Sequence, residues 1–259
     1  KEAMVGVSHF SDIGFALDES NNVSFAASLN SLMQNCQMSP LGSDGSDCLI
    51  KDKSGAELHI GLKRNASGQW ELRAANPAFA GEGHADIEIV ADVSDPRYVP
   101  FERRFSAHFA GDQAPIVFEL ADPREASRFV PGTKDSVSIA AFSREPHVFP
   151  DEAAYMKAQG NEKIKFAANY FVPSGMFFQK MGGTMDDGAK QPLADADFAG
   201  TVLKAEQRTN AFGQKFWWTT LNTYSDAIFD VVMDSSVSET PKAGSIVTGR
   251  FWLSARIAP

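Results

Sequence analysis

Long apolar runs are missing from this sequence of 259 residues. No segment approaches the roughly 20 consecutive apolar residues that a membrane helix needs. Lys1–Ser11 also lacks the apolar stretch of a signal peptide, although a removed leader would leave no trace. We therefore expect a cytoplasmic protein with no membrane partner.

Cysteine is scarce, because only Cys36 and Cys48 are present, on either side of a turn at Pro40-Leu41-Gly42. Their spacing allows a disulfide but does not prescribe one. A chain of this length can bury a sizeable core without a covalent cross-link. The sequence therefore favours free thiols.

Basic residues are outnumbered, and the formal net charge of -9 makes a nucleic-acid partner unlikely. The acidity is uneven along the chain. Residues 1–129 contain 11 basic and 19 acidic side chains, whereas residues 198–259 contain 6 and 5. The last segment is therefore close to neutral within an acidic protein.

Catalytic signatures are also lacking. Ser174 precedes Gly175, but the flanking residues do not form the Gly-x-Ser-x-Gly turn of a nucleophile, so a turn serine is the better interpretation. No connected acid, base and nucleophile can be assigned. We predict no cofactor, and we favour a binding or interaction protein over an enzyme.

The first part of the chain has the patterns of a sheet with one helix. Phe25, Leu29, Leu32 and Met33 recur at helical spacing after Ser24, which can cap a helix. Strands are expected at Cys48–Ile50, Glu57–Leu62 and Gln69–Ala74, then at His84–Val93, Phe105–Phe109 and Pro115–Leu120. The segment Asn76–Gly83 between them is predicted to be a loop.

The hairpin sequence Asp52-Lys53-Ser54-Gly55-Ala56-Glu57-Leu58, with a helix before it and strands after it, resembles a glyoxalase/dioxygenase-type βαβββ module. Such modules hold a metal with His and Glu side chains on a cupped sheet. The resemblance implies His9 and His59 as candidate ligands, but it supplies no complete set.

A second metal hypothesis comes from alternation within the strand expected at residues 84–93. His84, Asp86 and Glu88 fall on one face, and Ala85, Ile87 and Ile89 on the other. Three potential ligands in a row suggest a metal site. The same pattern is typical of the solvated face of a half-buried strand, which is the interpretation we favour.

Three segments are expected in the chain: an α+β sheet domain at 1–129, an extension and flexible connection at 130–197, and a small barrel at 198–259. Residues 95–97 and 122–124 both read Asp-Pro-Arg, and their unlike surroundings indicate two turns and not a duplication. The middle segment is predicted to hold a strand near Val137–Ala141, a short helix after Pro150 and a strand at Ile164–Val172.

The last segment is predicted to form strands at Phe198–Arg208, Gln214–Thr223, Ala227–Met233 and Ser245–Ile257. Phe198-Ala199-Gly200-Thr201-Val202, the aromatic Phe216-Trp217-Trp218 and the late glycine-containing strand Ala243–Phe251 resemble an OB-fold barrel. It departs from that fold in lacking the helix usual between the third and fourth strands. The predicted fold class is α+β, mainly β: an N-terminal antiparallel sheet with one packed helix, and a C-terminal OB-like barrel.

One row of residues in the last strand suggests a binding surface. Arg250, Trp252 and Arg256 share a face opposite to the apolar positions, so a ring stands between two guanidinium groups. Such a row can stack on a base or another planar ligand, with Trp218 as a further candidate. Alternatively, Trp252 lies under the first domain and the arginines pair with its surplus carboxylates.

The sequence thus predicts a binding protein for an unknown protein or a small planar ligand. Binding of single-stranded nucleic acid by an OB module and a metal-dependent enzyme are the alternatives. The oligomeric state is left open.

Overall fold

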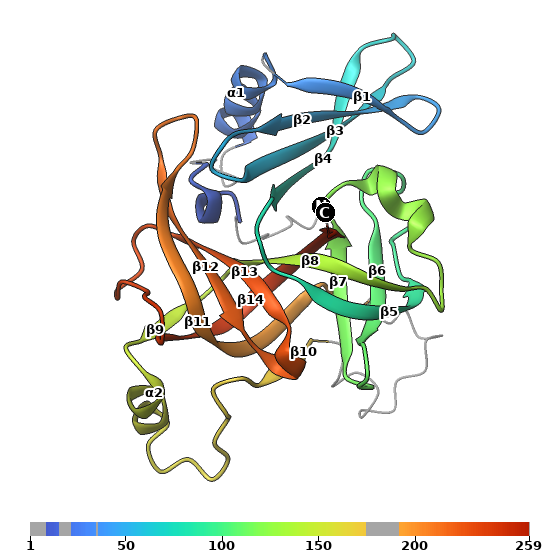
Figure 1. Cartoon of the computed structure of the whole chain (residues 1–259). Coiled ribbons are helices and arrows are strands. Elements are labelled where there is room, and N and C mark those ends of the chain that lie inside the picture. Colours follow the sequence, from blue (N-terminus) through green and yellow to red (C-terminus); the bar gives the residue numbers. More distant parts are fainter. Residues whose placement is uncertain (1–8, 16–21, 35, 175–191, 259) are drawn as a thin grey trace.

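The computed structural model describes residues 9–15, 22–34, 36–174 and 192–258 of the chain. These residues form a four-stranded sheet and a ten-stranded sheet, most of which curves into a barrel. Figure 1 shows the smaller sheet above the barrel, with the C-terminus between them. No helix among the described residues is long and apolar enough to cross a membrane.

The four-stranded sheet follows helix α1 (Asn22–Met33) and is antiparallel throughout, in the order β1-β2-β3-β4. Its strands are β1 (Gln37–Leu41), β2 (Gly45–Lys51), β3 (Ala56–Arg64) and β4 (Trp70–Phe79). The predicted helix and hairpin are confirmed, and Gly55 takes the left-handed conformation that the turn requires (φ 89°). The loop expected from Asn76 is wrong in part, because β4 continues to Phe79. Pro77 is tolerated there since β4 is an edge strand.

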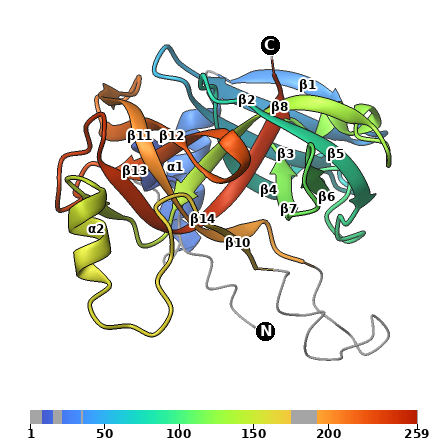
Figure 2. The ribbon, with the colours of Figure 1, turned by 60° about the horizontal axis from the view of Figure 1, so that its bottom comes forward.

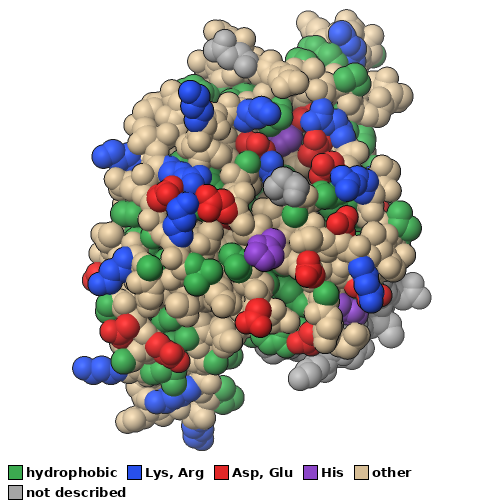
Figure 3. All heavy atoms as spheres, viewed as in Figure 1, with side chains coloured by type: hydrophobic (Ala, Val, Ile, Leu, Met, Phe, Trp, Pro, Cys, Tyr) green, Lys and Arg blue, Asp and Glu red, His purple; other side chains and the backbone are tan. Residues whose placement is uncertain are grey.

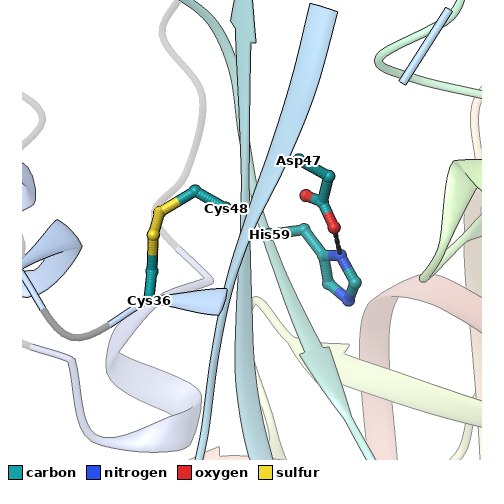
Figure 4. Close-up of a disulfide and its surroundings, with 4 residues drawn as sticks. All are labelled: Cys36, Asp47, Cys48 and His59. Carbon is teal, nitrogen blue, oxygen red and sulfur yellow. Dashed lines mark hydrogen bonds and ion pairs between the residues drawn. A yellow bond between two sulfur atoms is a disulfide. The ribbon is translucent and has the colours of Figure 1, made fainter. Parts of the chain in front are cut away.

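A disulfide joins Cys36 to Cys48, so the expectation of free thiols is wrong. Their Cα atoms lie 5.4 Å apart, within the ordinary range for a disulfide. Figure 4 shows the bond tying the residue before β1 to the middle of β2. Sequence spacing could not supply this pairing, because it arises from the way β1 folds back along β2.

Eight strands close the barrel, and β9 (His147–Phe149) and β10 (Phe171–Pro173) extend its sheet at the edges. The eight are β5 (Ala85–Asp92), β6 (Arg104–Phe109), β7 (Pro115–Leu120), β8 (Lys134–Ser143), β11 (Asp195–Thr209), β12 (Lys215–Asn222), β13 (Ile228–Asp234) and β14 (Ile246–Ile257). The four strands predicted between residues 198 and 259 are confirmed within a few residues. One continuous apolar core fills the barrel, with Phe105, Phe118, Phe198, Phe229 and Phe251 among its largest side chains.

The barrel consists of two units with the same strand pairings. We call β5–β8 unit one and β11–β14 unit two. In each unit the first strand pairs antiparallel with the second and the fourth, and the second pairs antiparallel with the third. The third strand of each unit pairs parallel with the fourth strand of the other. The two fourth strands, β8 and β14, pair antiparallel, with Ala141 opposite Leu253.

The boundary between the two sheets does not coincide with the segment boundaries expected from the sequence, at residues 129/130 and 197/198. Strands from all three expected segments share the ten-stranded sheet, and the change from one sheet to the other falls between β4 and β5. Within the middle segment, helix α2 (Glu152–Ala158) agrees with the prediction. The strand predicted at Ile164–Val172 is wrong, because only β10 forms there, at its end.

Three short 3-10 helices complete the described structure. Helix η1 (Ser11–Ile13) lies before α1, and its residues Asp12 and Ile13 are buried. Helix η2 (Pro123–Arg128) lies between β7 and β8, with Asp122 capping its first turn. Helix η3 (Tyr224–Asp226) lies between β12 and β13.

A second apolar cluster joins the four-stranded sheet to the outside of the barrel. From the sheet it includes Leu58, Ile60 and Phe79, and from unit two it includes Phe216, Trp218, Val232 and Trp252. Because β12 alternates, Phe216 and Trp218 point out of the barrel whereas Leu221 belongs to its core. The outer face of unit two is therefore buried under the four-stranded sheet.

Candidate binding surface

The predicted Arg250, Trp252 and Arg256 row is divided between three environments. Trp252 is only 8% exposed, and its ring stacks on His9 at 5.3 Å and contacts Phe142 at 5.1 Å between ring centroids. Arg250 is exposed and lies 3.4 Å from the carboxylate of Asp197 on β11. The ring that was expected to stack on a ligand is therefore packed inside the protein.

Arg256 connects the barrel to the four-stranded sheet. Its Nη2 donates to Oε2 of Glu57 on β3 at 2.6 Å, and the carboxylate is largely buried. This contact matches the alternative in which the arginine pairs with a carboxylate of the first part of the chain. The only arginine of the row with a largely exposed side chain is Arg250.

Trp218 is fully buried on the outer face of β12. Its Nε1 donates to Oδ1 of Asp230 at 2.8 Å, and the Arg208 guanidinium lies 3.7 Å from the ring centroid. Lys204 Nζ lies 4.7 Å from the same ring. The side chain thus already has the cation–π and hydrogen-bond partners that a ligand would have to supply.

Asp230 holds the chain between β4 and β5 against unit two. Its carboxylate accepts hydrogen bonds from the backbone N–H groups of Glu82 and Gly83, at 3.0 and 2.9 Å. A Cβ at Gly81 would lie about 2.0 Å from this carboxylate, so glycine is needed for the close approach. Burial raises the pKa of Asp230, although these donors and Trp218 oppose the rise.

A row of buried charged side chains, which the sequence analysis did not identify, lies on the four-stranded sheet. It is on the face opposite to Leu58 and Ile60, which pack on unit two. His59 Nδ1 is 2.9 Å from Oδ2 of Asp47, and its Nε2 is 3.9 Å from Oε2 of Glu57, which in turn binds Arg256. Figure 4 shows His59 and Asp47 meeting on the face of the sheet away from the disulfide. Alternation of Glu57 and His59 with Leu58 and Ile60 was the available sequence signal.

The electrostatics of this row favour the charged forms. Burial opposes protonation of His59, but Asp47 and Glu57 outweigh it and raise the pKa of His59 to about 9. Burial likewise opposes ionisation of Glu57, yet His59 and Arg256 lower the pKa of Glu57 to about 2. Two anions and two cations alternate, so the arrangement is neutral and suits a structural role better than proton transfer.

The side chains predicted as a metal site, those of His84, Asp86 and Glu88, are not arranged to bind one ion. Glu88 lies 3.5 Å from Lys134 Nζ, whereas His84 pairs by an isolated bridge with Ile228 of β13. Within the part of the chain that the structure describes, no three His, Cys, Asp or Glu side chains are arranged to hold a metal ion. His9, His59, His84, Asp86 and Glu88 are all within that part of the chain.

His84 and Asp86 instead line a shallow pocket of about 200 Å³ beside helix η3. Ser225 and Asp226, on its other side, have positive φ angles of 56° and 57°. Non-glycine residues adopt this conformation uncommonly, and when they do the position is often functional. No hydrogen bond joins these side chains to His84 or Asp86, so the pocket contains no assembled catalytic group.

The outer face of unit one differs from that of unit two. On β6 and β7 it presents Arg104, Ser106, His108 and Glu119, each partly exposed. Arg104 Nη2 binds Glu119 Oε1 at 2.6 Å. In the adjoining loop, burial and the charge of Glu119 raise the pKa of Glu102 to about 7. We call this face, with loop 93–103, the unit-one face; it carries charges of both signs, and one of its side chains, Phe101, is buried against Leu41 and Ala74 of the four-stranded sheet.

Charges of both signs are also interspersed elsewhere on the surface. Figure 3 shows Lys and Arg side chains lying among Asp and Glu side chains, with no continuous basic area on the face in view. Comparison of the sequence with protein-family models and with curated proteins finds no match. The assignment of function therefore depends on the geometry described above.

Proposed function

We propose that this chain is a binding protein without catalytic machinery, and that a polypeptide partner docks on the unit-one face. The supporting observation is the contrast between two matching surfaces. The outward positions of β12 are filled by the chain's own sheet, whereas those of β6 in unit one are partly exposed polar side chains, and only Val117 of β7 joins the buried cluster from β6 and β7. The surface that the fold covers less completely is the better candidate for binding.

The strand pairings support an OB-type origin for both surfaces. The ring β11-β12-β13-β8-β14 has five strands, as does the ring β5-β6-β7-β14-β8. An OB barrel is a five-stranded Greek-key barrel that binds ligands on the face of its second and third strands. In unit one those strands are β6 and β7, and η2 occupies the position of the usual helix between strands three and four.

The chemistry of the unit-one face favours a polypeptide over a nucleic acid. Arg104 is neutralised by Glu119, and Glu88 lies directly across from His108 in the β5–β6 pairing. A single-strand site needs a continuous basic groove with exposed rings. Mixed charges with polar side chains are typical of the rim of a protein interface.

The test is a peptide selection against the intact protein, followed by binding measurements with two variants. His108→Glu adds one negative charge to the unit-one face, and Lys215→Glu makes a larger charge change, of two units, at an exposed position on β12. We expect selected peptides to bind the wild type and the Lys215→Glu variant equally and to lose at least about fivefold in affinity with His108→Glu. Peptides that bind all three proteins equally would exclude this face.

A fluorescently labelled single-stranded oligonucleotide serves as the competing probe. We expect no binding at low salt, where phosphate contacts are strongest. Salt-dependent binding that weakens in Arg250→Ala would instead support the nucleic-acid alternative, because Arg250 is the exposed member of the predicted row.

The disulfide supports an oxidising compartment in preference to the cytoplasm expected from the sequence. Thiol labelling of the protein isolated from its native source measures this directly. Two reactive thiols in the unreduced protein would favour the cytoplasm.

A further inference from the structure

The chain after α2 forms a loop whose ends are closed by one glutamine side chain. Gln159 Nε2 donates to the backbone oxygen of Phe166 at 3.0 Å, and Gln159 Oε1 accepts from the backbone N–H of Phe166 at 2.7 Å. The side-chain amide thus makes the pair of bonds that a neighbouring strand would make. We call residues 159–166 the Gln159 loop.

Both ends of the Gln159 loop are anchored to the barrel. Tyr155, before the loop, is buried with Ala168, Ala199 and Ile246 in a small apolar cluster. At the end of the loop, the Phe166 ring lies 4.6 Å from that of Tyr170, whose hydroxyl is 3.2 Å from Thr248 Oγ1 on β14. These contacts fix both ends of the loop in position.

The tip carries the most exposed large apolar side chain of the described residues. Ile164 is 74% exposed and Phe166 is 46% exposed. Figures 1 and 2 both show α2 and the following chain projecting from the barrel, away from the four-stranded sheet. Apolar side chains exposed on a projecting, anchored loop are available for contact with another surface.

Cations surround this apolar tip. Lys163 and Lys165 flank Ile164, and Lys157 lies at the end of α2. Glu162 is the one acid within residues 157–166, so this stretch has a charge of +2 in a protein of charge -9. None of the three lysines takes part in a salt bridge with a described residue.

We propose that the Gln159 loop docks on an anionic lipid surface, with Ile164 and Phe166 entering the headgroup region and the lysines lying among lipid phosphates. The shape favours lipid over protein, because a projecting apolar tip fits a fluid surface without needing a matching pocket. Apolar side chains flanked by lysine are the combination that interfacial segments use. The contact is independent of the unit-one face and goes beyond the proposed function.

The acidic remainder of the protein limits this contact. Asp151 and Glu152 stand at the start of α2, and the whole-chain charge opposes approach to an anionic surface. Lysine attraction acts only within about 10 Å at moderate salt. We therefore expect weak, reversible binding that depends steeply on salt.

The experiment is co-sedimentation of the full chain with vesicles of phosphatidylcholine, with and without phosphatidylglycerol. We expect binding only to the phosphatidylglycerol vesicles, with a loss of at least about tenfold in Lys163→Glu/Lys165→Glu. Ile164→Asp should lose binding to a similar extent. Gln159→Ala should weaken binding although it leaves every residue of the tip in place.

Two variants control for exposed apolar area and for charge. Val130→Asp removes another exposed apolar side chain, and Lys215→Glu reverses a charge on β12; both should bind as the wild type does. No binding to phosphatidylglycerol vesicles at low salt would overturn the proposal. Binding that is unchanged by Ile164→Asp but abolished by polyglutamate would also overturn it, since it would point to an acidic protein partner.

Discussion

The two barrel units have the same strand pairings but opposite outer surfaces. In unit two the outward positions of β12 are aromatic and buried, and in unit one those of β6 are polar and partly exposed. The backbone pattern therefore does not decide which surface is free. What decides it is the four-stranded sheet, which covers the outward side chains of β12 but leaves those of β6 partly exposed, although Val117 of β7 and Phe142 of β8 join the same apolar cluster.

This contrast explains why aromatic content was a misleading guide to a binding surface. Trp218 and Trp252 have the alternation of an exposed platform, but their rings contact the chain's own residues. Aromatic side chains bury more area than any others, so they accumulate at interfaces within a protein as well as between proteins.

The largest expected effect is on the covered face. Trp218→Ala removes a fully buried ring with its hydrogen bond to Asp230, and should lower the free energy of unfolding by about 3–5 kcal/mol. His108→Ala on the unit-one face should change it by less than about 0.5 kcal/mol. Urea unfolding measures both. Equal losses in the two variants would mean that the faces are not different in burial.

The disulfide should give the next largest effect, through the sheet that covers unit two. The cysteines are separated by 12 residues, and closing a loop of this size stabilises by about 3 kcal/mol. Cys36→Ala/Cys48→Ala should lower the free energy of unfolding by that amount, and reductant should lower it equally in the wild type. A reductant effect that persists in the double variant would contradict the assignment.

The row of buried charges between the sheet and β14 should make stability depend on pH. The pKa of His59 is raised to about 9, so its contribution is complete below about 6.5 and is lost as pH rises through 9. The loss should be on the order of 2–3 kcal/mol in urea unfolding. His59→Gln should flatten the curve over this range, whereas an unchanged curve would remove His59 as the cause.

At acidic pH, Glu57 should determine how the free energy of unfolding depends on pH. Its pKa is lowered to about 2, so its contribution is present above about 4.5 and is lost as pH falls through 2. Glu57→Gln leaves Arg256 without its anion and should remove this acid dependence. Arg97→Gln provides the control with little expected effect, because Arg97 pairs with Asp95 through a side chain that is 78% exposed.

The smallest effect is expected at His84, directly before β5 of unit one. His84→Ala should change the free energy of unfolding by less than about 0.5 kcal/mol, because the side chain is exposed. We also expect the variant and the wild type to give the same calorimetric response to Zn²⁺. A wild-type binding signal that disappears in His84→Ala would restore the metal hypothesis.

Local patterns in the sequence predicted most individual strands and the helix. The segments expected at Gln214–Thr223 and Ala227–Met233 match β12 and β13 to within one residue at each end. The strand expected at Ile164–Val172 failed because its apolar residues serve the Gln159 loop instead. Its backbone partner is the Gln159 side chain, a contact that periodicity cannot encode.

The two-unit arrangement was missed because it lies in the strand pairings and not in the residues. Asp95-Pro96-Arg97 and Asp122-Pro123-Arg124 form turns inside unit one, so they were never equivalent positions. The decisive contacts join distant segments, as Val231 of β13 and Ala141 of β8 do. Likewise, the sequence predicted a small closed sheet in the last segment. It gave no sign that β5, β6 and β7 belong to that sheet and not to the domain expected at residues 1–129.

Neither barrel unit can be completed before β14, the last barrel strand in the sequence, has been synthesised, because β14 pairs with both β7 and β8. The third strand of each unit pairs with the fourth strand of the other. Strand β7 therefore has no parallel partner until residues 254 and 255 are available. Contacts across such separations slow folding, because long loops must close first. Nascent chains that stop before β14 should leave unit one open and sensitive to protease, even though every strand of that unit has already been made.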